Sequence, residues 1–275
     1  MAHAPLLILV VILALLSERR VDARKAVHAR HLQEVGATSL TLEGKDLNDF
    51  ALASTIKAER TKATKRGLIA QVSGEGTAYS DAVPDASGFA CAKREIPKKA
   101  QKMFAAINSE MWNGGENCGK CVQVWCVDSF CKKRFEPQTL MVVDKCPECG
   151  PGDLDLSNPA YQEITGIWPH RLKFEWKFVD CLDTFDYGDK IRMDLKAGPN
   201  QWWRAFYFSM NKEPLANVTL DGRPLSKAEF GFWNDWNELG KGPHKLVLTS
   251  ETGKTLEASV DDVMKDTQYL DVQFD

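Results

Sequence analysis

The sequence predicts a mainly β protein with two domains, a small closed barrel followed by a β-sandwich. Three observations carry this prediction. From residue 71 onward, short runs of β-type residues alternate with glycine-rich turns. All eight cysteines lie between Cys91 and Cys181, so one region is stapled and the next is not. From about residue 187 the cysteines stop and short strands recur at regular spacing, which is typical of a sandwich.

The N-terminal residues 1–23 have the pattern of a secretory signal peptide. The apolar run from Leu6 to Leu16 is too short to span a bilayer, and the small-residue pattern ending at Ala23 follows it. We expect cleavage after Ala23, and the alternative is an uncleaved anchor. Residues 24–70 predict a flexible or partly helical leader. Its Lys65-Arg66 pair is either a dibasic processing site or solvated charge.

Composition excludes several classes of partner. A length of 275 residues suits two modest domains plus extensions. The formal net charge of −3 gives no reason to expect nucleic acid or an anionic membrane as a partner. We expect no membrane contact after cleavage of the signal peptide. Most of the eight tryptophans follow residue 165, and tryptophans in excess of core needs often form flat binding platforms.

Residues 71–183 are expected to form the barrel domain. Apolar residues alternate over 172–179, which predicts a half-buried strand, and other β-type runs cover 76–79, 121–127 and 139–143. Two stretches have helical composition, 96–108 and 159–165.

The cysteines have two interpretations. Behind a signal peptide, an even set in one region predicts up to four disulfides. The alternative is a zinc ribbon, because Cys118-x-x-Cys121 and Cys146-x-x-Cys149 have zinc-ligand spacing. We favour disulfides and expect neither a metal nor a cofactor.

Residues 187–275 are expected to form the sandwich. Asp221-Gly222 between two β-type runs predicts a hairpin. The linker is too short to let the domains wander, so we expect them to pack together. Asn217-Val218-Thr219 is an acceptor sequence for N-glycosylation.

The most informative segment covers residues 144–157. A strand runs directly into Asp144, a glycine- and proline-rich turn follows, and Asp155 then stands between two leucines. Buried leucines would leave Asp155 pointing the other way, so two carboxylates would meet in one cleft, as acid-assisted sugar chemistry requires. The alternative is a tight turn in which the aspartates cap backbone N–H groups.

In this layout the chain resembles the expansins and their microbial relatives, over roughly residues 73–275. The resemblance rests on four sets of strings in order: Gly76-Thr77-Ala78-Tyr79 with residues 85–91, the cysteine-rich run 118–126, the acidic segment 143–157, and Gln201-Trp202-Trp203 with residues 240–243. It implies a six-stranded double-psi β-barrel, related to that of family 45 glycoside hydrolases, and then an immunoglobulin-like sandwich that binds polysaccharide. It also implies the disulfides Cys91–Cys118, Cys121–Cys181 and Cys126–Cys131, which leaves Cys146–Cys149 as a local pair.

The resemblance also implies site residues. Asp155 corresponds to the acidic residue of the barrel groove and to the general acid of the hydrolases. Asp144 and Thr77 correspond to further polar groups of the groove, and Tyr79 to an aromatic there. Burial would raise the pKa of Asp155, and a nearby Asp144 would act in the same direction. Asp153 stands where plant members have His, which leaves the electrostatics of the groove open.

A flat aromatic face is implied for the second domain. Trp202 and Trp203 correspond to its paired aromatics, although neighbouring residues on a strand point to opposite faces unless a bend intervenes. The third aromatic has several candidates, and we favour Trp233 among Phe230, Phe232, Trp233 and Trp236.

The resemblance implies a secreted, monomeric protein of the cell wall. We expect it to bind cellulose or β-glucan and to loosen the polysaccharide without hydrolysis, because expansins lack the second carboxylate of the hydrolases. The alternative is a weak inverting endoglucanase with Asp155 as acid and Asp81 as base. Asp81 lies two residues after Tyr79, a context like that of the hydrolase base, but it is equally explained as a turn residue before Pro84.

Overall fold

The computed structural model of the protein describes residues 71–181 and 184–275, which fall in one compact unit. The predicted signal peptide, its cleavage after Ala23 and the leader of residues 24–70 lie outside the described residues. Within the described ranges, no helix combines the length and the apolar character needed to cross a bilayer.

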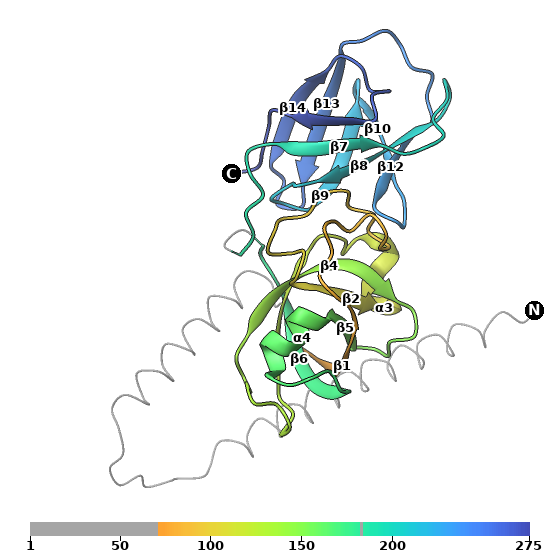
Figure 1. Cartoon of the computed structure of the whole chain (residues 1–275). Helices are drawn as coiled ribbons and strands as arrows, with labels where there is room; N and C mark the ends of the chain where they lie inside the picture. Colours follow the sequence, from red (N-terminus) through yellow and green to blue (C-terminus); the bar gives the residue numbers. More distant parts are fainter. Residues whose placement is uncertain (1–70, 182–183) are drawn as a thin grey trace, which may run out of the picture. The chain divides into compact units, whose positions relative to one another are not determined.

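The first part of the described chain forms a closed six-stranded barrel with the strand order β1-β5-β2-β4-β3-β6 (Figure 1). This confirms the predicted double-psi β-barrel, whose core is one continuous cluster of buried apolar side chains. Its strands are β1 (Val72–Ser80), β2 (Phe104–Asn108), β3 (Cys121–Cys126), β4 (Gln138–Cys146), β5 (Leu154–Ser157) and β6 (Leu172–Val179).

Strand β1 closes the barrel. It pairs in parallel with β5 and antiparallel with β6. Gly74 of β1 packs directly on the turn before β5, since a Cβ on Gly74 would lie 2.2 Å from the carbonyl oxygen of Gly152. The same carbonyl accepts a 2.8 Å hydrogen bond from Trp176 Nε1. Backbone contact at this point therefore requires glycine.

The predicted helix over residues 96–108 is wrong. Residues 104–108 form β2 instead, and all five are buried. This strand lies between β4, to which it is parallel, and β5, to which it is antiparallel. Pairing on both edges overrides the helical composition, because a strand's environment decides more than its intrinsic propensity.

The helices of the described residues are short. They are α3 (Ser109–Trp112), the 3₁₀ turn η1 (Asn113–Gly115) and α4 (Asn158–Thr165). The last confirms the helix predicted for residues 159–165. Ser157 Oγ caps α4 by accepting from Ala160 N at 3.2 Å, and Gly166 ends the helix in the left-handed conformation.

All eight cysteines form disulfides, and the four pairs are Cys91–Cys118, Cys121–Cys181, Cys126–Cys131 and Cys146–Cys149. The predicted pairing is confirmed throughout. The zinc-ribbon alternative is excluded, because zinc binds thiolates and none of these sulfurs is free.

The second part of the described chain forms two sheets that enclose a separate apolar core, as predicted for a β-sandwich. One sheet has the order β10-β9-β13-β14, and the other has the order β11-β12-β8-β7-β15. The strands are β7 (Ile191–Leu195), β8 (Arg204–Ser209), β9 (Leu215–Leu220), β10 (Arg223–Pro224), β11 (Ser226–Lys227), β12 (Phe232–Asp235), β13 (His244–Ser250), β14 (Thr255–Val260) and β15 (Thr267–Leu270). The predicted hairpin is confirmed, because Asp221 and Gly222 connect β9 to β10 with positive φ at both residues.

Polar contacts link the barrel loops to the five-stranded sheet. Lys93 Nζ donates to the Phe208 carbonyl oxygen at 3.1 Å. Glu95 accepts from Arg192 at 3.4 Å and from the Tyr269 hydroxyl at 2.8 Å. These contacts agree with the expectation that the two parts pack together. The exact domain boundaries, at residues 183 and 187, stay a prediction.

The backbone contact at Gly74 gives a first test. Gly74→Ala is expected to destabilise the protein by about 3 kcal/mol, because the new methyl group meets rigid backbone rather than a movable side chain. Gly88→Ala is the matched control, since a Cβ there meets nothing within 4 Å, and we expect a change within about 0.5 kcal/mol. Urea unfolding monitored by fluorescence would measure both, and equal effects would refute the assignment.

Candidate functional site

Asp155 and Thr77 lie side by side on the outer surface of the barrel. Leu154 and Leu156 are buried, so Asp155 between them faces away from the core, as expected. The register pairs Thr77 with Asp155, and Thr77 Oγ1 donates a 2.7 Å hydrogen bond to Asp155 Oδ1.

Burial raises the pKa of the Asp155 carboxyl above its ordinary value. The hydrogen bond from Thr77 and the positive charge of Arg171 oppose this shift, whereas the negative charge of Glu148 adds to it. The neighbouring carboxylate that matters is therefore Glu148, and the expectation that Asp144 plays this part is corrected. This shift favours the protonated form of the Asp155 carboxyl.

Sequence reasoning missed Glu148. This residue lies in the turn that the Cys146–Cys149 disulfide closes, and one of its carboxylate oxygens lies within 4.8 Å of an Asp155 carboxylate oxygen. The Cys146 sulfur belongs to the same cluster, but its disulfide prevents it from ligating a metal. An acidic residue inside a Cys-x-x-Cys turn that precedes a strand was the available signal.

Asp144 and Asp153 brace the backbone. Asp144 Oδ1 accepts from the backbone N–H groups of Ala90 at 2.8 Å and Lys145 at 2.9 Å. Asp153 accepts from Glu75 N at 2.7 Å and from Gly150 N at 3.1 Å. The alternative interpretation of the acidic segment, in which aspartates cap backbone groups, therefore describes these two residues, and Asp155 departs from it.

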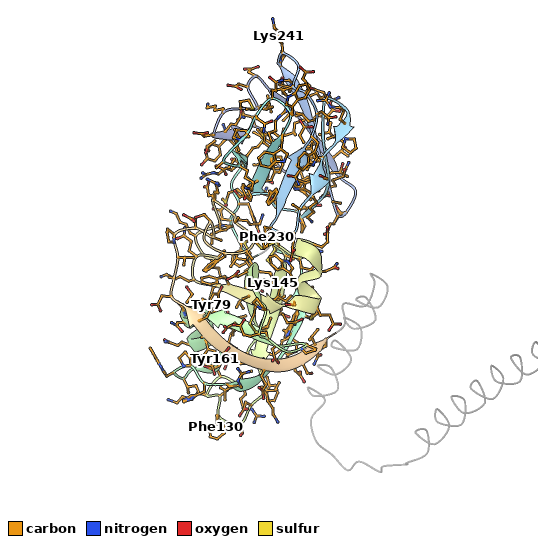
Figure 2. All side chains as sticks on the ribbon, turned by 90° about the vertical axis from the view of Figure 1, so that its right-hand side faces the viewer. Tyr79, Phe130, Lys145, Tyr161, Phe230 and Lys241 are labelled. Atoms are coloured by element: carbon orange, nitrogen blue, oxygen red, sulfur yellow. A yellow bond between two sulfur atoms is a disulfide. The ribbon has the colours of Figure 1, made fainter. Side chains whose placement is uncertain are left out.

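Tyr79 stands beside the acidic residues. Its ring packs against Phe89 and Phe104, with centroids at 5.8 Å and 6.0 Å, and its side chain remains 37% exposed (Figure 2). Burial, together with the charges of Asp144 and Asp155, raises the pKa of its hydroxyl far above the ordinary value. Tyr79 therefore stays protonated, and its hydroxyl hydrogen-bonds the Asp144 carboxylate.

Asp81 follows β1 and is exposed. Its Oδ1 accepts a 2.8 Å hydrogen bond from Asn158 Nδ2, at the start of α4. This contact fits the interpretation of Asp81 as a residue that fixes the end of β1.

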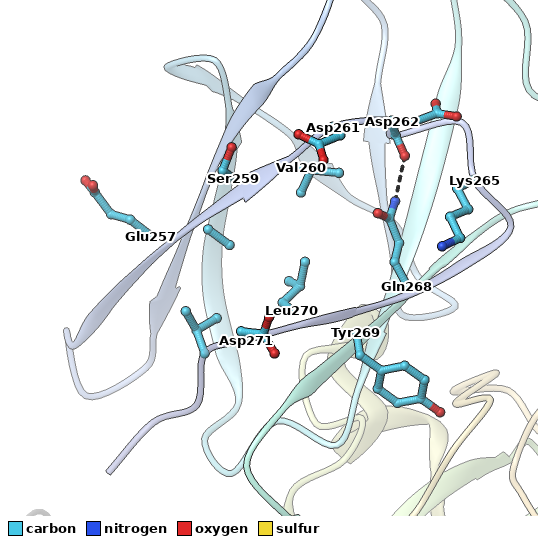
Figure 3. Close-up of a pocket in the computed structure, with 12 residues that line it drawn as sticks. Glu257, Ser259, Val260, Asp261, Asp262, Lys265, Gln268, Tyr269, Leu270 and Asp271 are labelled. Atoms are coloured by element: carbon cyan, nitrogen blue, oxygen red, sulfur yellow. Dashed lines mark hydrogen bonds between the residues drawn. The ribbon is translucent and has the colours of Figure 1, made fainter.

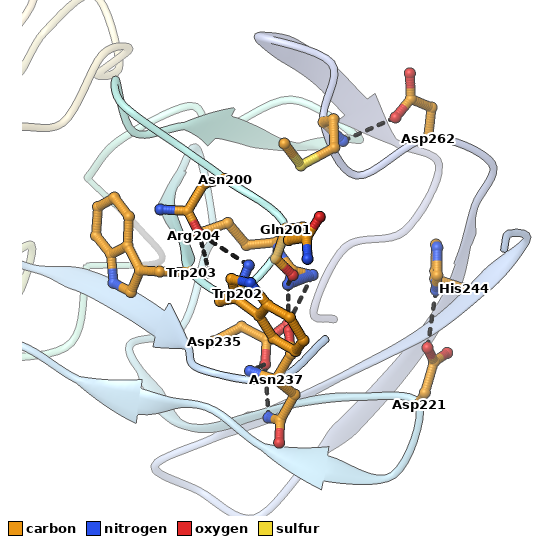
Figure 4. A network of polar contacts seen from close by, with 11 residues as sticks. Asn200, Gln201, Trp202, Trp203, Arg204, Asp221, Asp235, Asn237, His244 and Asp262 are labelled. Atoms are coloured by element: carbon orange, nitrogen blue, oxygen red, sulfur yellow. Dashed lines mark hydrogen bonds and ion pairs between the residues drawn. The ribbon is translucent and has the colours of Figure 1, made fainter. Parts of the chain in front are cut away.

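Three tryptophans form a second surface on the sandwich. Trp202 is 56% exposed and Trp236 is 67% exposed, while Trp203 is half-buried with its ring centroid 6.0 Å from that of Trp236. Asn200 Oδ1 accepts from the backbone N–H groups of Trp202 and Trp203 at 2.8 Å and 2.9 Å (Figure 4). This turn precedes β8, so the alternation of a strand does not force the two rings apart.

Trp233 is buried, with only 4% of its surface exposed, and the prediction that it completes the aromatic surface is wrong. Trp233 alternates with Phe232 and Asn234 along β12 and points into the apolar core. Trp236 lies just beyond the end of this strand and takes the exposed position beside Trp203. We call Trp202, Trp203 and Trp236 the tryptophan platform.

A buried ion pair anchors the platform. Arg204 and Asp235 are fully buried, and Arg204 Nη1 lies 3.2 Å from Asp235 Oδ2. Arg204 also donates to the carbonyl oxygens of Gln201 and Asn237, and Asp235 accepts from Asn237 Nδ2 at 2.7 Å (Figure 4). The pair thus ties the turn that carries Trp202 and Trp203 to the loop that follows Trp236.

Two further features lie apart from Asp155 and the tryptophan platform. An open pocket of about 520 Å³ between β14 and β15 has an acidic lining that includes Glu257, Asp261 and Asp271, and none of the predicted site residues lines it (Figure 3). Asn217, the predicted glycosylation acceptor, is exposed on β9, and its modification stays a prediction.

The chain shares sequence similarity with known proteins. A family model described as lytic transglycolase matches residues 104–168. The chain is 27% identical to Expansin-YoaJ of Bacillus subtilis over 126 residues, which are 44% of this chain and 52% of that protein. It is 24% identical to Expansin-B11 of Oryza sativa over 187 residues, 57% of this chain and 60% of that protein. The chain therefore spans only between half and two thirds of these relatives.

Solved structures show the same fold. The crystal structure of the apo Clavibacter michiganensis expansin superposes with a TM-score of 0.60 at 21% identity, covering 74% of this chain and 98% of that one. A mutant of that expansin in complex with cellohexaose gives the same TM-score at 20% identity and the same coverage. In its barrel, in the sandwich that follows and in its matched relatives, the chain is similar to the expansins.

Proposed function

We propose that this protein binds cellulose or a related β-glucan of the cell wall and loosens it without cutting the chain. The observation that carries the proposal is the tryptophan platform, whose exposed rings are fixed by the buried Arg204–Asp235 pair. Aromatic rings stack on the apolar faces of pyranose rings, and an open row of them suits a long chain better than a small pocketed ligand. The cellohexaose complex of the Clavibacter expansin supports this ligand class.

The barrel groove supplies the polar half of the proposed site. Thr77, Tyr79 and Asp155 offer hydroxyl and carboxyl groups to the hydroxyls of a glucan. Inverting hydrolysis requires a base about 6.5–9.5 Å from the acid, with room for water between them. Glu148 lies too close to Asp155 for that arrangement, since their oxygens approach within 4.8 Å. This spacing counts against inverting hydrolysis by the Asp155–Glu148 pair.

The proposed setting is extracellular, with the protein acting as a monomer at the cell wall. The predicted signal peptide supports it, and so do the four disulfides, because such bonds persist in oxidising compartments.

A weak endoglucanase is the second candidate function. The raised pKa of Asp155 favours it, because a general acid must hold its proton near the working pH. In this alternative Asp155 is the acid and Asp81 is the base.

The platform gives a binding test. Trp236→Ala is expected to weaken retention on cellulose by about 5- to 100-fold, because stacking of one ring on an aromatic contributes roughly 1–3 kcal/mol. Phe130→Ala is the control, since Phe130 is 75% exposed in the turn closed by the Cys126–Cys131 disulfide of the barrel. Depletion isotherms on amorphous cellulose would measure both variants, and equal retention of the two would count against the platform.

Hydrolysis is tested by counting new reducing ends on amorphous cellulose and mixed-linkage β-glucan. We expect no release by the wild-type protein above that of Asp155→Asn, while both proteins stay on the solid. Release that disappears in Asp155→Asn and in Asp81→Asn would establish the endoglucanase instead. Release that disappears in Glu148→Gln but persists in Asp81→Asn would identify a different pair of carboxyls.

The raised pKa of Asp155 predicts a pH dependence of stability. The folded protein holds this proton more tightly than the unfolded chain, so the free energy of unfolding falls as pH rises from about 3.9 through the folded-state pKa. Asp155→Asn keeps an acceptor for Thr77 but carries no charge. We expect it to raise Tm at pH 7 by up to a few degrees and to change Tm little near pH 3, where both states hold the proton. Calorimetric scans at both pH values would measure this, and a lower Tm at pH 7 would contradict it.

A further inference from the structure

The loop between α4 and β6, residues 167–171, is fixed on both sides of its tryptophan. The Tyr161 hydroxyl donates to the His170 carbonyl at 2.7 Å and accepts from His170 N at 3.1 Å. The Thr165 hydroxyl contacts the backbone oxygen and nitrogen of Ile167 at 3.3 Å and 3.2 Å. Tyr161 and Thr165 are themselves fully buried. The fold therefore holds Trp168 in a restrained loop.

Trp168 is nevertheless 72% exposed, which makes it one of the two most exposed large apolar side chains of the described residues. A single exposed apolar residue is common and indicates nothing by itself. A tryptophan on a restrained loop is different. When a ligand stacks on it, the protein loses little further conformational entropy, because the loop is already ordered.

The strand register places this loop next to the groove. Gly76 of β1 is the last residue of this strand that pairs with β6, opposite Leu172, and Thr77 follows it and pairs with Asp155 of β5. Arg171 directly precedes Leu172, so a continuation of the register would bring it opposite Thr77, two strand spacings or about 10 Å from Asp155.

The contacts of Arg171 agree with this row. Its Nη1 lies 3.3 Å from Glu75 Oε2 on β1, and its positive charge acts on the Asp155 carboxyl. Both Arg171 and Glu75 are largely exposed, so their ion pair contributes little stability and can rearrange around a ligand.

We propose that Trp168 and Arg171 form a further sugar subsite, which extends the barrel groove across β6. The indole of Trp168 stacks on one pyranose ring, and the Arg171 guanidinium donates hydrogen bonds to its hydroxyls. The proposal rests on the proposed function. It specifies where on the barrel a bound glucan chain would continue beyond Asp155.

The charges of the groove select the class of glycan. Glu75 and Glu148 carry negative charge near the proposed subsite, and Arg171 and Lys173, which lies opposite Glu75 in the strand register, carry positive charge. These charges balance, so the surface offers a polyanionic chain no net electrostatic attraction. The subsite therefore fits a neutral β-glucan rather than a polyuronate.

The test is a calorimetric titration of the protein, without its predicted signal peptide, with cellohexaose. It is carried out in the wild-type protein and in a Trp203→Ala/Trp236→Ala double variant, which lacks two of the three platform rings. Trp168→Ala is expected to weaken binding by about 5- to 100-fold in that background. Trp168→Phe should retain most of the affinity, because it keeps an aromatic face. Arg171→Gln should weaken binding by a smaller factor. Thermal melts confirm that each variant is folded.

Phe135→Ala is the matched control. Phe135 is 61% exposed on the same barrel, but the Arg134 guanidinium already covers its ring at 4.8 Å from the centroid. We expect this variant to bind cellohexaose as well as its parent does.

Four outcomes overturn the subsite. They are equal binding by Trp168→Ala and its parent, equal losses in Trp168→Ala and Phe135→Ala, absence of cellohexaose binding in the platform-deficient background, and tighter binding of polygalacturonate than of cellohexaose. The proposed function fails separately, when the wild-type protein binds neither cellulose nor cellohexaose. Retention on cellulose that depends on Trp236 but not on Trp168 would keep the proposed function and refute the subsite.

Discussion

Closure of the barrel by β1 is the constraint on which the arrangement of Thr77 and Asp155 depends. This strand pairs with β5 on one edge and β6 on the other, and its register alone brings Thr77 beside Asp155. The close approach of Gly74 to the Gly152 carbonyl fixes that register, because neither backbone can move without opening the barrel. The Trp176 indole holds the same carbonyl from the core side. Site geometry and barrel stability thus share one contact.

Carboxylates that look alike in the sequence do different work, and their surroundings decide which. Asp144 and Asp153 accept hydrogen bonds from backbone N–H groups and hold the turn. Asp155 instead accepts a hydrogen bond from the Thr77 hydroxyl. Its partial burial raises the pKa of its carboxyl and so favours the protonated form. The Cys146–Cys149 disulfide closes the turn that carries Glu148, and this places the negative charge of Glu148 near the Asp155 carboxyl. A general acid, if the groove has one, is therefore confined to a single position.

In the tryptophan platform, charged side chains serve to hold loops in place: the buried Arg204–Asp235 ion pair lies beneath the exposed rings. Arg204 and Asp235 carry opposite charges in the interior, where desolvation is costly and lowers the pKa of Arg204. Their additional hydrogen bonds run to the backbone of the two loops that bear the exposed rings. A buried ion pair of this kind contributes less to net stability than to holding a fixed geometry. Exposed tryptophans on mobile loops would lose more entropy on binding a flat polysaccharide.

The sequence by itself determined the fold class, because strand runs, turn residues and the confined cysteines are local patterns. Its ordered motifs also carry the resemblance to the expansins, which implied three of the disulfides, left Cys146–Cys149 as the fourth, and implied the segments with Thr77, Asp155 and the first two tryptophans. Three features were decided only by the tertiary structure. Residues 104–108 became a buried strand because β4 and β5 offered pairing partners on both edges. Trp236 rather than Trp233 reached the surface because the inward side of β12 is set by packing against the sandwich core. Glu148 lies beside Asp155 because the disulfide-closed turn folds back onto β5, the strand that follows it. The first two features depend on contacts between residues distant in the chain, which local pattern does not encode.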